Sequence, residues 1–241
     1  MEDSIPNTSP ISSSVLKWMA ILTMTIDHIG AVLIEPMLYN SSGSSIATGI
    51  DWQFIYTSCR LVGRLAFPIY CFLIVEGYIH TRSVPKYASR LGLFALISEI
   101  PFDLAFSGQM FDWATQNVFF TLLLGLFAIW AYDTLDQPIL RIGLPMALAL
   151  FAQLLNTDYQ IYGVGFILIL FITRPNRLKQ TLIGALYGLS QMTASLAFIP
   201  IYFYNGKKGR GNSKWLYWFY PVHLLILAGM AYLIFNTPFL F

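Results

Sequence analysis

The chain has 241 residues, of which 56% are hydrophobic and only 11% are charged. Soluble domains carry about 25% charged residues, so the composition excludes an ordinary soluble protein and indicates one embedded in a lipid bilayer. The net charge of +2 is too small to argue for a nucleic-acid partner, and we expect none.

Residues 1–14 are polar and lack the basic start of a signal peptide. We therefore expect a disordered tail there and a single integral membrane domain over residues 15–241. Spanning a bilayer takes about 20 mostly apolar residues. The stretches that meet or approach this requirement are 15–36, 55–79, 87–106, 117–132, 139–155, 162–173, 181–204 and 215–236. They predict an all-α, polytopic transmembrane helical bundle of about eight spans.

Two interpretations of residues 181–204 remain open. A single crossing fits the length of the stretch, and it is the one we predict. A re-entrant hairpin would bring the number of spans to nine or ten, and it would place both ends of the stretch on one side of the membrane.

Lys and Arg residues in short loops mark the cytoplasmic side of a membrane protein. Two loops are basic, namely 81–86 and 174–180. Three loops carry no Lys or Arg, namely 39–53, 107–116 and 156–160. The pattern predicts a cytoplasmic N-terminus. With a single crossing at 181–204, the basic loop 205–214 would lie outside and His223 would share the depth of His28.

Charged residues within the predicted spans are expensive, at about 2.5–3.5 kcal/mol each at a helix centre. They are Asp27, Arg60, Arg64, Glu76, Glu99 and Asp103. Arg60 and Arg64 share one helix face, as do Glu99 and Asp103, so the two pairs can neutralise each other. Together with Asn117 and His223, which fall at a similar depth, they predict an aqueous pocket between the bilayer centre and the outer face.

Asp27 and His28 are neighbours within the first predicted span, in the sequence TMTIDHIGAV. Adjacent side chains on a helix point about 100° apart, so the two do not pair with each other. We expect Asp27, or an acid of the third span, to neutralise Arg64, and His28 to face the pocket. His28 is then either a hydrogen-bonded structural residue or a catalytic one. Glu76 and His80 are i,i+4 but lack further ligands nearby, and we expect no metal.

Several segments, in order over residues 16–227, closely resemble the TraX family of membrane proteins, the F-pilin acetylase type. They are LKWMAILTMTIDHIGAVL, RLVGRLAFPIYCFLIVEGYIHTR, YASRLGLFALISEIPFDLAF, NVFFTLLLG and YPVHLLIL. The resemblance implies an acetyltransferase of the bacterial cytoplasmic (inner) membrane, with acetyl-CoA as the donor. It also implies the N-terminal amine of a pilin-like peptide as the acceptor. A more distant similarity to membrane acyltransferases that acetylate sugars adds a glycan acceptor and an intramembrane histidine.

Acyl transfer from a thioester needs a base, groups that stabilise an oxyanion, and a grip on the donor's phosphates. His28 is the expected general base or transient acetyl carrier, with Asp27 beside it. The expected pocket and oxyanion residues are Arg60, Arg64, Glu99, Asp103, Asn117 and His223. The expected residues for the phosphates of acetyl-CoA are Arg82, Lys86, Arg90, Lys207, Lys208 and Arg210.

Two other classes of function remain possible from the sequence. In a proton-coupled transporter, Asp27, Glu99 and His28 would form a proton relay across the membrane. The sequence lacks the repeated halves with matching broken helices that many transporters show. The second alternative is an assembly subunit that carries out no chemistry of its own.

Overall fold

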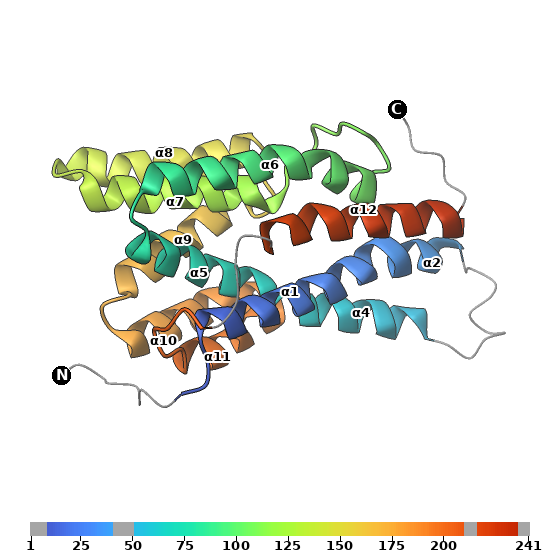
Figure 1. Ribbon diagram of the computed structural model, residues 1–241, viewed down its shortest axis with the longest axis horizontal. Coiled ribbons are helices and arrows are strands. Elements are labelled where there is room, and N and C mark those ends of the chain that lie inside the picture. Colours follow the sequence, from blue (N-terminus) through green and yellow to red (C-terminus); the bar gives the residue numbers. More distant parts are fainter. Residues whose placement is uncertain (1–8, 41–50, 210–215, 236–241) are drawn as a thin grey trace.

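The computed structural model describes residues 9–40, 51–209 and 216–235, so most of the predicted N-terminal tail lies outside the described residues. Within these ranges the protein is all-helical, and its helices run roughly along the long axis of the molecule (Figure 1). By length and composition alone, four helical segments of the described residues could cross a membrane: Ser13–Leu38, Trp52–His80, Arg177–Tyr202 and Leu216–Phe235. The third of them is interrupted by non-helical backbone at Gln191 and Met192 and folds back on itself. Shorter apolar helices accompany them. The predicted all-α class is confirmed, whereas the number of spans stays a prediction.

The first long helix starts where the sequence provides a cap. Helix α1 (Ser13–Ile29) follows Ser12, whose hydroxyl accepts a hydrogen bond from the Val15 backbone N–H. A π-helical turn, η1 (Gly30–Ile34), continues it into α2 (Glu35–Asn40). Such insertions are rare and often lie at functional sites.

The second long segment is broken in its middle. Helix α4 (Trp52–Gly63) ends at a two-residue turn, and α5 (Ala66–His80) begins after it. Pro68 has no N–H and its ring would clash with the carbonyl of residue 64, so a continuous helix is disfavoured here. The Leu65 N–H bonds to the Val62 carbonyl instead of that of Leu61. The freed Leu61 carbonyl accepts a hydrogen bond from the Thr193 hydroxyl.

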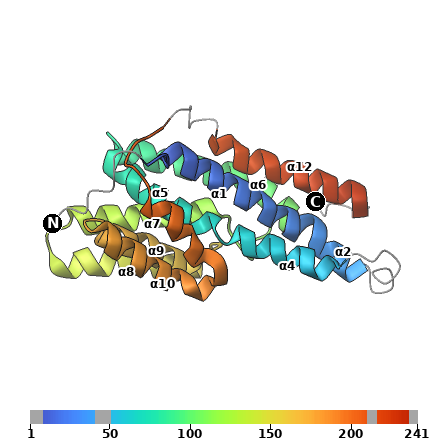
Figure 2. The ribbon, with the colours of Figure 1, turned by 90° about the horizontal axis from the view of Figure 1, so that it is seen from below.

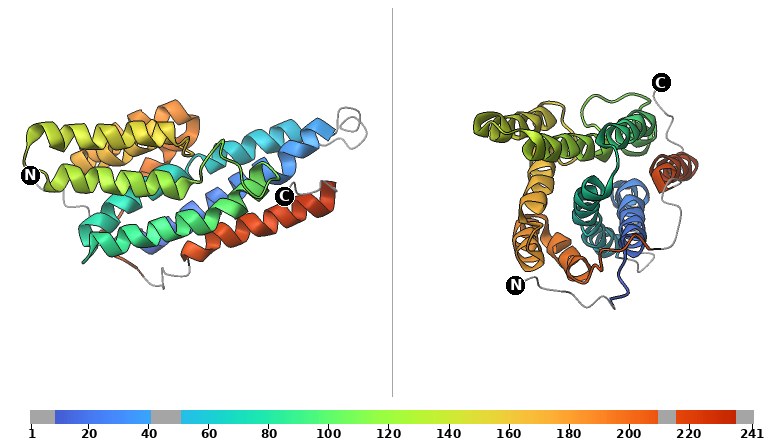
Figure 3. Two further views of the ribbon diagram at one scale, coloured as in Figure 1. Left: turned by 90° about the horizontal axis from the view of Figure 1, so that it is seen from above. Right: turned by 60° about the vertical axis from the view of Figure 1, so that its left-hand side comes forward.

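Helix α5 is apolar around its whole circumference and is the most buried element, as expected for a helix surrounded by others. Seen from one side of the bundle, α5 lies between α1 and α12 on one side and α9 and α10 on the other (Figure 3). Helix α12 (Leu216–Phe235) packs along α6 (Val84–Phe106) and beside α1 (Figure 2).

Helices α7 (Val118–Thr134), α8 (Pro138–Leu154) and α9 (Gln160–Thr173) form a second group. The loops that precede α7 and α9 pair with each other. The Gln116 N–H bonds to the Asn156 carbonyl at 3.0 Å, and the Asp158 N–H bonds to the Gln116 carbonyl at 2.8 Å. The two loops therefore lie at the same end of the bundle, as their lack of basic residues predicts.

The predicted single crossing of residues 181–204 is wrong. Helix α10 (Arg177–Gly188) leads into the 3₁₀ stretch η2 (Leu189–Ala197), where the chain turns at Met192 with φ 57°. The short α11 (Phe198–Tyr202) then packs back against α10. We call residues 177–202 the re-entrant hairpin. Its polar residues Ser190, Gln191, Thr193 and Ser195 interrupt an otherwise apolar run, and this break outweighs the suitable length.

The loop after the hairpin lies beside the start of α1. The Asn205 N–H bonds to the Ile11 carbonyl and the Ser13 N–H bonds to the Lys207 carbonyl, each at 2.9 Å. The basic loop is therefore at the same end as the start of α1, and not at the opposite end as predicted. This arrangement agrees with the usual distribution of charge in membrane proteins, whose Lys- and Arg-rich loops gather on one side. Residues 210–215, which include Arg210, lie outside the described residues.

Candidate functional site

A cavity of about 720 Å³ lies between α1, α5, α6, α7 and α12. Cationic side chains surround the end near the 81–83 loop: Lys17, Arg82, Lys86, Arg90 and Lys208. Along α1 the cavity wall runs from Ser13 to Met24, which is about 16 Å of helix. Mostly apolar side chains line this part, and the deep end is formed by Val118, Phe119 and Tyr220. We call the cationic end the basic mouth.

The basic mouth includes four of the residues expected to bind phosphates, namely Arg82, Lys86, Arg90 and Lys208. The predicted Lys207 is exposed and does not line the cavity. Sequence reasoning missed Lys17. Its position, one turn into the first apolar segment, could have indicated a cation at the membrane surface. Backbone pairing of the 207–208 segment with the start of α1 brings Lys17 and Lys208 to the same opening.

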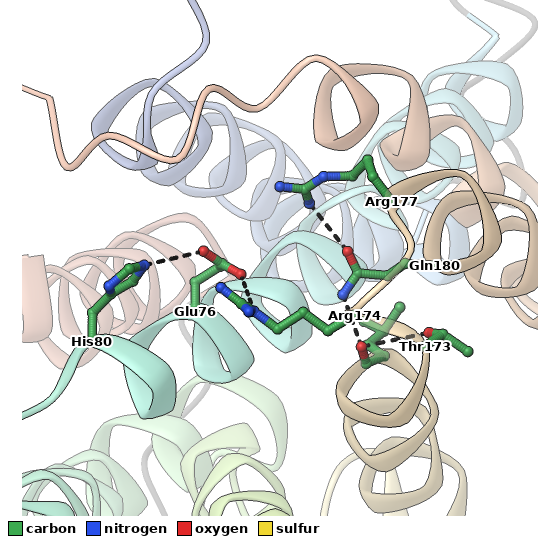
Figure 4. A network of polar contacts seen from close by, with 7 residues as sticks. Glu76, His80, Thr173, Arg174, Arg177 and Gln180 are labelled. Carbon is green, nitrogen blue, oxygen red and sulfur yellow. Dashed lines mark hydrogen bonds and ion pairs between the residues drawn. The ribbon is translucent and has the colours of Figure 1, made fainter. Parts of the chain in front are cut away.

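A buried carboxylate, that of Glu76, also lines this cavity. Figure 4 shows the polar network around it. Glu76 is 5% exposed, accepts a 2.9 Å hydrogen bond from Arg174 Nε, and lies 3.5 Å from His80 Nε2. In the same network, Arg177 donates to the Gln180 side chain, which in turn donates to the Leu170 carbonyl. The Arg174 cation compensates the Glu76 charge, and the network ties α5 to the connection between α9 and α10.

His28 and His223 form the central pair of the candidate site. Nδ1 of His28 lies 2.7 Å from Nε2 of His223, and Nδ1 of His223 lies 2.8 Å from the Phe219 carbonyl oxygen. The ring centroids are 5.0 Å apart and the planes differ by 6°. With such a short nitrogen–nitrogen distance, the two rings meet edge to edge in nearly one plane rather than face to face.

The Phe219 carbonyl determines which nitrogen carries each proton. A carbonyl oxygen only accepts, so a neutral His223 has its proton on Nδ1 and a lone pair on Nε2. That lone pair accepts the Nδ1–H of His28. Nε2 of His28 is left with its own lone pair, which is the state a general base requires.

Tyr220 stands between the cavity and this histidine pair. Its ring centroid lies 6.0 Å from that of His28, 5.7 Å from that of His223 and 5.2 Å from that of Phe119. Tyr220 is 5% exposed and forms part of the deep end of the cavity. Sequence reasoning missed this residue, although its spacing of i,i+3 from His223 in YPVH places both on one helix face.

Asp27 pairs with Arg60 and not with Arg64, contrary to the prediction. Asp27 Oδ2 lies 2.8 Å from Nη1 of Arg60. Asp27 rests on Gly63, where an added Cβ would come within 2.0 Å of its carboxylate. Arg64 follows in the turn between α4 and α5 and makes no ion pair with any described residue.

The acids of α6 find partners close to their own helix, so the expected neutralisation of Glu99 and Asp103 by Arg60 and Arg64 does not occur. Glu99 accepts hydrogen bonds from the backbone and side chain of Asn117. Asp103, which is 2% exposed, accepts one from the Asp112 N–H at 2.9 Å. Helix α6 packs against α7 and α12, and the loop that joins α6 to α7 supplies these donors.

Comparisons with known proteins agree with the resemblance seen in the sequence. The family model described as TraX protein matches residues 12–231. The chain is also 34% identical over 247 residues to a probable fimbrial assembly protein FimC, serogroup H1, of Dichelobacter nodosus. That match covers 90% of this chain and 94% of the relative. No solved structure matches the chain.

Proposed function

The chain belongs to the TraX family, and from this premise we propose that it is a membrane-embedded acetyltransferase. It moves an acetyl group from acetyl-CoA to an amine or hydroxyl acceptor. The observation that carries the proposal is a cavity that leads from the basic mouth to Tyr220, directly beside the His28–His223 pair. The relative's name connects that protein with fimbrial assembly, which favours a pilin-like peptide over a glycan as the acceptor.

The cavity suits the donor in size and chemistry. Its volume of about 720 Å³ is typical of cofactor sites, which range over roughly 300–1,000 Å³. The cations of the basic mouth would bind the coenzyme's phosphates. The mostly apolar wall that leads inward suits the pantetheine arm, so the thioester would arrive next to Tyr220.

In the proposed reaction, Nε2 of His28 accepts the acceptor's proton as the nucleophile attacks the thioester carbonyl. The tetrahedral intermediate collapses, the carbon–sulfur bond breaks, and the thiolate of CoA leaves and takes up the proton from His28. Nε2 of His223 accepts the Nδ1–H of His28 throughout and stabilises the transient imidazolium. Because Tyr220 separates the cavity from His28, its side chain has to rotate during each cycle.

The structure offers less support for the transporter alternative. Asp27 is engaged by Arg60 and Glu99 is engaged by Asn117. Among the hydrogen bonds of the described residues, none links either acid to His28, whereas a relay needs a connected path.

The proposal is tested with the purified full-length protein, radiolabelled acetyl-CoA, and a mixture of peptide amines and sugars. We expect label to appear on an acceptor, and the His28→Ala variant to transfer about 10²–10⁴-fold more slowly. Thr25→Ala is a matched control on α1, because its hydroxyl bonds the Ile21 carbonyl of its own helix. Normal transfer by a well-folded His28→Ala protein contradicts the mechanism, and transfer to no acceptor contradicts the activity.

A further inference from the structure

The cavity lacks the hydrogen-bond donors that the sequence predicts for an oxyanion. Arg60 pairs with Asp27, and the Asn117 amide donates to Glu99. Among the described residues that line the cavity, none is Arg60, Arg64 or Asn117. A thioester at the deep end therefore needs another donor for the negative charge that develops on its carbonyl oxygen.

The deep end of the cavity holds a hydroxyl, that of Tyr70 on α5. His80, at the other end of the same helix, lies next to the basic mouth, and ten residues of helix separate the two by about 15 Å. Tyr70 is the deepest residue that α5 contributes to the cavity wall, and Met24 is the deepest that α1 contributes. Their side chains meet, since the Tyr70 hydroxyl lies 3.8 Å from Sδ of Met24.

This meeting point is one helical turn from the histidine pair. Met24 precedes His28 by four residues on α1, so the two share one helix face. On α12, Tyr220 precedes His223 by three residues, and the Tyr220 ring centroid lies 6.0 Å from that of His28. The cavity wall thus brings Tyr70 to the level at which a thioester would reach the base.

The proton of the Tyr70 hydroxyl has a weak partner. Among the hydrogen bonds of the described residues, the Met24 thioether is the group that accepts it. A thioether sulfur is a weak acceptor, so a charged oxygen can replace it at little cost. The hydroxyl is also carried on a fixed backbone, because Ile69 and Cys71 on either side are fully buried. A donor that is already in place needs no reorganisation during the reaction.

Tyr220 is the other phenol at the deep end, and it suits this role less well. In the proposed reaction the Tyr220 side chain has to rotate so that the thioester can meet His28. An oxyanion donor has to keep its place while the charge develops. Tyr70, on the opposite wall, does not stand between the cavity and the base.

We propose that the Tyr70 hydroxyl is the oxyanion donor of the acetyl transfer, an inference that rests on the proposed function. As the acceptor attacks, the π electron pair of the thioester carbonyl moves onto oxygen, and the Tyr70 O–H donates a hydrogen bond to it while keeping its proton. When the intermediate collapses, this pair returns to re-form the carbonyl, the carbon–sulfur bond breaks, and the thiolate of CoA leaves. The hydroxyl then donates to Met24 again.

The test deletes one oxygen atom. Tyr70→Phe keeps the ring that packs between α5 and α1 and removes the donor. With the purified full-length protein and an acceptor that the wild type acetylates, kcat should fall about 10²–10³-fold, the usual effect of losing one oxyanion donor. KM for acetyl-CoA should stay within a few-fold, because the interaction is made only in the transition state.

Two further variants separate chemistry from packing. Tyr78→Phe removes a hydroxyl from the same helix at a residue that does not line the cavity. The Tyr78 hydroxyl donates to Asp133 at 2.7 Å, so this variant should lose thermal stability and keep its kcat. Met24→Leu keeps the Tyr70 hydroxyl and removes its resting acceptor, so it should lower kcat far less than Tyr70→Phe does.

A binding measurement does not depend on turnover. Carboxymethyl-CoA carries a negatively charged oxygen close to the position of the thioester oxygen, whereas CoA does not. In nanodiscs, Tyr70→Phe should raise Kd for carboxymethyl-CoA about 10-fold or more by titration calorimetry and leave Kd for CoA within a few-fold. If Tyr70→Phe folds poorly, Tyr70→3-fluorotyrosine provides a stronger donor and should lower Kd for carboxymethyl-CoA relative to CoA.

The outcomes distinguish this inference from the proposed function. Normal kcat in a well-folded Tyr70→Phe protein overturns the role of Tyr70 and leaves the acetyltransferase activity standing. An increase in KM alone, or an unchanged ratio of the two Kd values, also overturns it. A changed ratio without transfer to any acceptor by the wild type contradicts the activity, while the contact of Tyr70 with a charged oxygen is retained.

Discussion

The hydrogen bond between His223 Nδ1 and the Phe219 carbonyl determines the protonation of two histidines at once. It comes from within α12, since residues 219 and 223 are one turn apart. His28 by itself could carry its proton on either nitrogen. The neighbouring side chain therefore gives His28 the tautomer that a base needs, and His223 acts as a positioning residue.

His223→Ala should lower kcat for acetyl transfer by about 10–100-fold with little change in KM, because Nδ1 of His28 loses its acceptor. His223→Gln offers a side-chain oxygen to the same N–H and should recover most of the activity. Steady-state kinetics on both variants, with thermal unfolding to check the fold, provide the measurement. A loss of stability in both variants with unchanged kcat would reduce His223 to a structural role.

At this scale the sequence located the polar residues but not their partners. The i,i+4 spacing places Arg60 and Arg64 on one face, yet only Arg60 meets Asp27, because Pro68 ends the helix before Arg64. The acids of α6 are satisfied by a loop whose conformation no helical pattern encodes. Tyr220 was not predicted as a site residue, because an aromatic side chain in an apolar helix usually serves only to pack against its neighbours.

The contact between α1 and α4 depends on a glycine, Gly63, which has no side chain. Gly63→Ala would place a methyl group 2.0–2.3 Å from Asp27 atoms, so α4 would have to move and the Asp27–Arg60 pair would be disturbed. We expect a loss of about 2 kcal/mol in stability, typical of overpacking. Gly92→Ala in α6 is the control, since its nearest neighbour, Leu123, lies 3.6 Å away. Thermal unfolding in detergent compares the two variants, and equal stability would refute the close packing.

The re-entrant hairpin makes a prediction about topology. In a protein without Cys59 and Cys71, Lys207→Cys should react with a membrane-impermeant maleimide only after lysis, because residue 207 lies beside the start of α1. Trp113→Cys is the matched control at the other end, where Trp113 is 85% exposed. It should react in intact cells. Labelling of both positions in intact cells would restore the single crossing.

Helices were predictable where composition and caps agree. The segments begin close to the expected residues because Ser12, Ser83 and Asn117 cap them. The re-entrant hairpin was not predictable in this way. A length criterion treats residues 181–204 as one stretch and ignores the polar residues at its centre. The hydrogen bond of Thr193 to a carbonyl freed in another helix is a tertiary contact, which no window of sequence contains.

On the scale of the whole molecule, the helices enclose a cavity that leads toward His28. The cavity reaches the histidine pair from the end that holds the basic mouth, with Tyr220 in between. The two loops that carry no basic residues pair with each other at the other end. In the proposed function, a donor that enters at the basic mouth would meet the base once Tyr220 has rotated.

The basic mouth provides the test of the donor's route. Arg82→Gln, Lys86→Gln and Arg90→Gln should each raise KM for acetyl-CoA about 10-fold, the equivalent of one charge-assisted hydrogen bond of ~1.5 kcal/mol. KM for S-acetylpantetheine should not change, because this donor lacks the nucleotide and its phosphates. Arg141→Gln is the control, since the Arg141 guanidinium lies over the Tyr132 ring at 4.5 Å, outside the cavity. Parallel increases for both donors would show that the substitutions disturb the fold, and unchanged KM values would remove the basic mouth as the entrance for acetyl-CoA.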